Sequence, residues 1–180
     1  MGEVSPKEFD NSLRRVFLII IELFERIIQA LEKNEINDPS LCKEIHATDL
    51  IVDKFVDYCA RILNRSVGII PERKKQLIFS SLFILELIGD EFKYIAKHLA
   101  TSKKPLKECI ELAKLTQEQF EMYYKLYYKF DRELAIKFGE MDYKVYKQHF
   151  KTKENLKGEC RSIAKHVMMI SKFMLALVEL

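Results

Sequence analysis

Apolar residues recur three and four positions apart along almost the whole sequence, which is the spacing of one face of an α-helix. Alternating apolar and polar positions, which would predict β-strands, are missing. The pattern predicts an all-α protein of about six helices, with the ranges 6–33, 39–64, 71–101, 105–128, 133–150 and 154–180. Because every connection is short, consecutive helices are expected to pack antiparallel.

An internal repeat divides the sequence into two related halves. The segment 86–98 aligns with the segment 154–166, and the two share two glutamates, a Lys/Arg position and the run Ile-Ala-Lys-His. The repeat predicts two tandem antiparallel three-helix bundles, one in residues 6–101 and the other in residues 105–180. The second bundle is shorter by about 25 positions, or about seven helical turns in total.

Composition and charge narrow the class of protein. Apolar residues make up 48% of the chain and charged residues 32%, a balance typical of a folded globule. The net charge of +3 is too small to indicate nucleic-acid binding. The most apolar run, residues 16–21, is closely bracketed by charges and too short to span a bilayer. With four widely spaced cysteines and no signal peptide, the sequence predicts a soluble protein of the reducing cytoplasm.

Two pairs of carboxylates are the main candidate for chemistry. Asp49 and Asp53 are four residues apart on the second helix, and Glu86 and Asp90 are four apart on the third. This spacing places both members of a pair on one side of their helix, roughly 60–120° from the centre of the apolar face, on its flank. A cation between them would relieve their repulsion, and such oxygen ligands suit Mg²⁺, Mn²⁺, Ca²⁺ or iron. The alternative is an ordinary charged helix surface.

Gly89 is the second unusual feature of this region. Glycine inside a helix costs about 1 kcal/mol relative to alanine. Gly89 lies on the apolar face, next to Asp90. Two explanations stay open, a close approach between helices and room for an ion.

Other patterns typical of enzymes are missing. The four histidines are scattered and none forms the Glu-x-x-His motif of di-iron bundles. The sequence also has no glycine-rich phosphate loop and no nucleophile in a recognisable motif. We therefore expect that the protein is not an enzyme.

A cluster of aromatic residues occupies the predicted fourth helix and its end. Its members are Phe120, Tyr123, Tyr124, Tyr127, Tyr128 and Phe130. Core packing with exposed tyrosine hydroxyls is the favoured explanation. Nucleic-acid stacking and an oligomer or partner surface are the alternatives.

The segment 85–98 resembles the signature of the PhoU family of phosphate-uptake regulators. In that family the third helix of each bundle carries Glu-Arg-Ile-Gly-Asp, and here Glu86, Ile88, Gly89 and Asp90 match while Leu87 replaces the arginine. The segment 49–63 also resembles the family's second helix, which carries acidic residues four apart. The resemblance covers nearly the whole first half of the chain.

The resemblance implies a fold and a function. PhoU proteins are tandem three-helix bundles, often homodimers, that negatively regulate phosphate uptake and signalling. They act in the cytoplasm, at the inner face of the membrane, with a phosphate transporter and a sensor kinase. Their acidic motifs hold metal ions on the bundle surface, and by position the ligands here would be Asp49, Asp53, Glu86 and Asp90, with Mg, Mn or Fe as the metal.

The second half departs from the family pattern. Gly158 stands where the repeat alignment would place a second Asp90. Asp142, aligned with Asp49, is followed four positions later by Tyr146 and not by a carboxylate. A second metal cluster is therefore not expected. Two other functions stay open, a metal-dependent enzyme acting on phosphate compounds and a metal-free helical scaffold.

Overall fold

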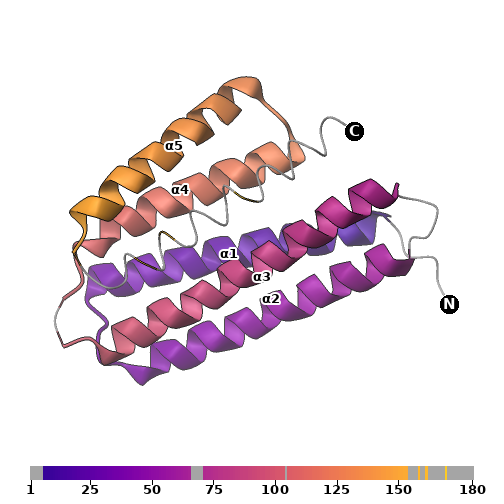
Figure 1. Cartoon of the computed structure of the whole chain (residues 1–180). Coiled ribbons are helices and arrows are strands. Elements are labelled where there is room, and N and C mark those ends of the chain that lie inside the picture. Colours follow the sequence, from indigo (N-terminus) through magenta and orange to yellow (C-terminus); the bar gives the residue numbers. More distant parts are fainter. Residues whose placement is uncertain are drawn as a thin grey trace.

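The computed structural model describes residues 6–65, 71–103 and 105–153, together with Gly158, Arg161 and Met169. These residues form five α-helices and no strand, which confirms the predicted all-α class. The helices are α1 (Pro6–Lys33), α2 (Pro39–Arg65), α3 (Glu72–Thr101), α4 (Cys109–Tyr128) and α5 (Arg132–Lys151). Figure 1 shows α2 and α3 side by side at the bottom, with α4 and α5 at the top.

Most predicted helix ends lie within one or two residues of the observed ends. The exception is α4, which the sequence predicts from residue 105 and which begins at Cys109. Lys107 and Glu108 form a turn first, across which the Cys109 amide donates to the Leu106 carbonyl over 2.9 Å. The predicted sixth helix, residues 154–180, lies outside the described residues apart from three isolated positions.

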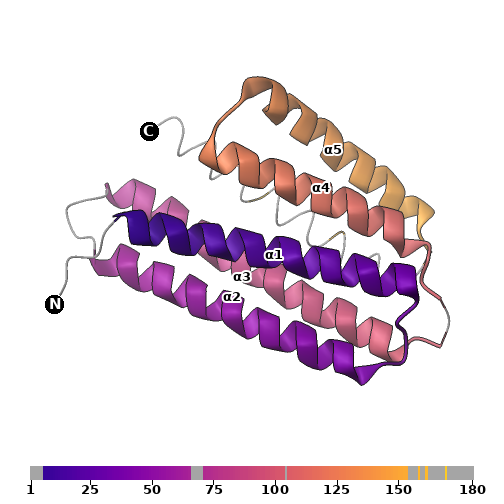
Figure 2. The same cartoon turned by 180° about the vertical axis from the view of Figure 1, so that it is seen from behind.

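Helix α1 lies between the α2–α3 pair and α4 and packs against all three helices (Figure 2). Within its apolar run, Val16, Phe17, Ile19 and Ile20 are buried, while Leu18 is partly exposed. The buried residues fill one broad face of α1, which is wide enough to contact three neighbouring helices, while Arg14, Glu22 and Glu25 lie exposed on the opposite face. No helix in the described part of the chain is long and apolar enough to cross a membrane.

The aromatic cluster joins α1 to α4. The ring of Phe17 lies 5.2–6.0 Å, centroid to centroid, from Phe120 and the four tyrosines of α4. Tyr123 is fully buried, so core packing is the correct explanation for most of the cluster. The expectation of exposed hydroxyls is wrong for Tyr123 and Tyr128, whose hydroxyl oxygens are buried.

Helix α5 packs on the outer side of α4 (Figure 1). Asp131 caps it, because its side chain accepts a 2.7 Å hydrogen bond from the Leu134 amide. The buried apolar residues of α1 to α5 form one cluster, which runs from the first predicted bundle into the second. The division into bundles 6–101 and 105–180 stays a prediction.

Candidate carboxylate site

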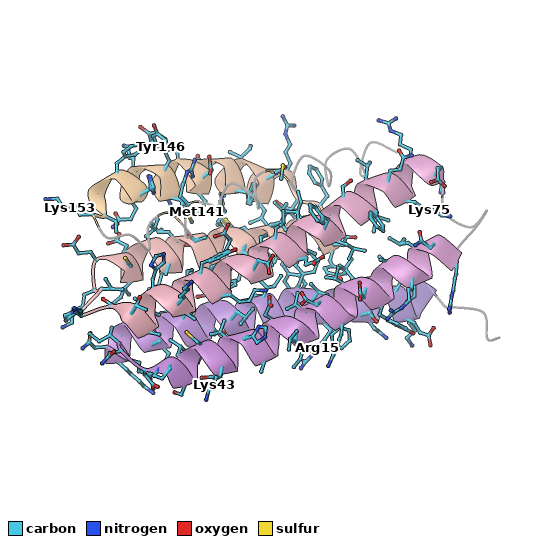
Figure 3. The ribbon with its side chains drawn as sticks, turned by 60° about the horizontal axis from the view of Figure 1, so that its bottom comes forward. Arg15, Lys43, Lys75, Met141, Tyr146 and Lys153 are labelled. Atoms are coloured by element: carbon cyan, nitrogen blue, oxygen red, sulfur yellow. The ribbon has the colours of Figure 1, made fainter. Side chains whose placement is uncertain are left out.

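The four predicted ligands come from two helices that pack along each other. Asp49 and Asp53 lie on α2, and Glu86 and Asp90 lie on α3. Figure 3 shows these two helices running together, with Lys75 near the beginning of α3. The predicted pairing of the two acidic motifs across adjacent helices is therefore present in the fold.

Asp49 is fully buried, which corrects the expectation that all four carboxylates lie on the flanks of their helices. It stands four residues after Ile45 and three before Val52, so it occupies a position of the buried stripe of α2. The spacing of these buried neighbours was the sequence signal for its burial. Asp53, Glu86 and Asp90 are partly exposed, as expected.

Lys93 supplies the positive charge at this site, and the sequence pattern did not predict this role. Its Nζ lies 2.7 Å from Asp49 Oδ2 and 2.5 Å from Asp90 Oδ1, so one ammonium group bridges the two helices. Partial burial acts to lower the pKa of Lys93, but the ion pairs with Asp49 and Asp90 outweigh it and raise the pKa. The available signal was its position three residues after Asp90, a spacing that favours ion pairs on a helix.

Gly89 is the point of closest approach between α2 and α3. A Cβ atom added there would lie 3.0 Å from Asp49 Oδ1 and 3.6 Å from Val52 Cγ1. Of the two explanations left open, close helix packing is therefore observed, and the carboxylate of Asp49 fills the space. Oδ1 of Asp49 has no hydrogen-bond partner among the described residues.

Asp53 and Glu86 lie close to several other carboxylates. Partial burial and the charge of Asp49 raise the pKa of Asp53. Partial burial and the charges of Asp53 and Asp90 raise the pKa of Glu86. Both shifts mean that ionising these two groups is less favourable in the folded protein than in an unfolded chain.

We expect this excess charge to weaken the fold as pH rises. A carboxyl group with a raised pKa binds its proton more tightly in the folded state, so it contributes a penalty that is absent below its ordinary pKa of about 4 and grows above it. The variant Asp53→Asn/Glu86→Gln should therefore unfold at a higher temperature than the wild type at neutral pH, with a gain of about 0.5 kcal/mol per site. Thermal melts should show the gain shrinking towards pH 4, and a constant gain would contradict this account.

The arrangement does not match a ready metal site. The cation between Asp49 and Asp90 is the ammonium of Lys93, so a metal bound by both would have to displace it. Among the described residues, no three or more His, Cys, Asp or Glu side chains are arranged to hold a metal ion. Metal binding by Asp49, Asp53, Glu86 and Asp90 stays a prediction.

The second half of the chain has a related ion pair. Asp142 of α5 lies 3.2 Å from Arg161 Nη1 and accepts a hydrogen bond from Gln119 of α4 over 3.3 Å. The guanidinium of Arg161 also lies over the ring of Tyr146, 5.3 Å from its centroid. Figure 3 shows Tyr146 on the outer side of α5.

The fold is that of a PhoU regulatory protein, which confirms the resemblance seen in the sequence. A solved structure with this fold is the phosphate transport system regulatory protein PhoU from Streptococcus pneumoniae, with a TM-score of 0.81 and 15% sequence identity. The match covers 95% of this chain and 93% of that one. No protein-family model matches the sequence, and no curated protein matches it. The likeness therefore lies in the fold.

Proposed function

We propose that this protein is a PhoU-like regulator of phosphate, or other ion, transport and signalling, and that it acts by contact with other proteins and not as an enzyme. The observation that carries the proposal is the fold, which matches that of a phosphate transport system regulatory protein over nearly the whole of both chains. The proposed partners are a membrane phosphate transporter or a sensor kinase, met at the inner face of the membrane. The predicted homodimer belongs to the same proposal.

The outer side of α3 is the proposed contact surface for such a partner. Phe79, Phe83 and Tyr94 are each about half exposed there. Their spacing along α3 places them on the same side of the helix as Glu86 and Asp90. Large aromatic side chains are enriched in protein interfaces and otherwise rare on protein surfaces.

Charge indicates what this surface would bind. Partial burial raises the pKa of Glu86, and the charges of Asp53 and Asp57 on α2 raise it further, so acidic groups of both helices lie next to the aromatic residues. A partner segment that is basic and carries apolar side chains fits it, because it would gain both apolar burial and charge neutralisation. We therefore propose a basic segment of the transporter or kinase as the occupant.

The function is tested by deleting the gene in its own organism and measuring uptake of radiolabelled phosphate under phosphate-rich conditions. If the protein restrains uptake, as the PhoU resemblance implies, the deletion should raise phosphate uptake several-fold while sulfate uptake stays unchanged. The wild-type gene should restore the low rate. Unchanged phosphate uptake would contradict regulation of phosphate transport, and a change in sulfate uptake alone would point to another ion.

The same assay tests the contact surface. Phe83→Ala/Tyr94→Ala should fail to restore the low rate, whereas Ile136→Ala/Tyr143→Ala should restore it. The control residues are equally exposed, but they lie on α5. Circular dichroism should show that both variants fold. If the two variants behave alike, the α3 surface is not the contact site.

A further inference from the structure

We propose that Lys93 in the first half and Arg161 in the second are built-in cations that take the place of bound metal, so that the protein keeps its structure without a metal ion. The PhoU resemblance implies metal at the acidic motifs, whereas the described side chains supply positive charge of their own. The inference concerns the chain itself and does not depend on which transport system it regulates.

The first half shows how one ammonium group serves as the cation between two helices. Lys93 Nζ contacts one carboxylate of α2 and one of α3 at ion-pair distance. One of these, Asp49, has no exposure to water, so its charge must be compensated from within the protein. Lys93 is about one-third exposed, so its head group reaches the site from the surface while its target lies inside.

The second half repeats the arrangement with arginine. Arg161 stands at the position of the repeat that corresponds to Lys93, and Asp142 stands at the position that corresponds to Asp49. The two repeat-related pairs are both ion pairs in the structure, Asp49 with Lys93 and Asp142 with Arg161. Two independent occurrences at matching positions indicate that this internal cation is a regular part of each half.

Electrostatics makes the side-chain cation and a metal at the same carboxylates mutually exclusive. A divalent ion held by Asp49 and Asp90 would lie within a few ångströms of the ammonium of Lys93, and like charges at such distances repel strongly in a partly buried site.

The two halves should respond differently when the cation is removed. Lys93→Ala leaves the carboxylates of Asp49 and Asp90, which share the ammonium in the wild type, without a cation between them, and such oxygen ligands together with water suit Mn²⁺. Arg161→Ala leaves Asp142 with Gln119, because Gly158 and Tyr146 stand where further carboxylates would be needed. Arg161→Ala is therefore the matched control.

The test is thermal unfolding of the full chain with and without millimolar MnCl₂, together with elemental analysis of the dialysed proteins. The wild type should contain no stoichiometric metal, and its melting temperature should not change in Mn²⁺. Lys93→Ala should melt at a lower temperature, regain most of the loss in Mn²⁺ and bind it at least tenfold more tightly than the wild type. Arg161→Ala should melt lower and should not respond to Mn²⁺.

Three results would overturn the proposal. One is stoichiometric metal in the wild type that is lost in Asp53→Ala/Asp90→Ala. Another is a Lys93→Ala variant that melts like the wild type and ignores Mn²⁺. If Lys93→Ala does not fold alone, folding on addition of Mn²⁺ supports the proposal, and failure to fold in Mn²⁺ as well counts against it.

Discussion

Replacing Lys93 with methionine is expected to lower the free energy of unfolding by about 2–4 kcal/mol, because it leaves the fully buried carboxylate of Asp49 without a counter-charge. Removing one member of a buried ion pair typically costs about 3–5 kcal/mol, and the expected loss is somewhat smaller because Lys93 itself reaches solvent. Methionine keeps most of the apolar stem, so the loss reports on charge and not on packing. Urea unfolding at neutral pH measures it.

The matched controls separate charge from shape. Asp49→Asn removes the buried charge and keeps the side-chain shape, so it should cost clearly less than Lys93→Met. In the double variant Asp49→Asn/Lys93→Met no charge remains buried, and it should recover much of the loss caused by Lys93→Met alone. If the two single losses simply add, Lys93 does not act through Asp49.

Gly89→Ala is expected to destabilise the protein by about 1–2 kcal/mol, although alanine is the better helix former. The added methyl group would lie 3.0 Å from Asp49 Oδ1, closer than ordinary contact, and Asp49 cannot easily turn away because Lys93 holds its other oxygen. Chemical denaturation of the single variant measures the effect. Gly139→Ala on α5 is the control, since a Cβ atom added there meets nothing within 4 Å, and it should stabilise by up to about 1 kcal/mol.

Whether Gly89→Ala stabilises or destabilises the protein depends on the side chain at position 49. In an Asp49→Ala protein the nearest contact is gone and Val52 Cγ1 remains at an ordinary 3.6 Å. Gly89→Ala should then be neutral or stabilising, because only the helix-forming gain is left. If Gly89→Ala destabilises equally in both backgrounds, the close approach to Asp49 is not the reason for glycine at this position.

The helices could be predicted from the sequence because their apolar stripes are long and regular. For α1, both ends agree with the prediction. The start of α4 does not, because the residues before Cys109 have helical composition and only the three-dimensional turn at Leu106 excludes them. Periodicity alone does not distinguish a helix from a single turn that leads into one.

Only part of the candidate site could be predicted from the sequence. Spacing identified the acidic pairs and their neighbouring helices, and the place of Asp49 between Ile45 and Val52 was a signal of its burial. The extent of that burial depends on how closely α3 approaches, which the sequence does not give. Lys93 was overlooked because a lysine beside an aspartate on a helix is usually solvated surface. Only the contact across the two helices reveals that its ammonium joins them.

The position of α1 between α2, α3 and α4 has a consequence for folding. Helix α1 packs against α2 and α3, and its Phe17 also packs against Phe120 and the tyrosines of α4. The two halves of the repeat therefore share a helix, and neither completes its apolar contacts alone. Cutting the chain at the connection after Thr101 would expose an aromatic surface on both fragments. We therefore expect the two halves to unfold together as one cooperative unit, although the repeat divides the sequence between them.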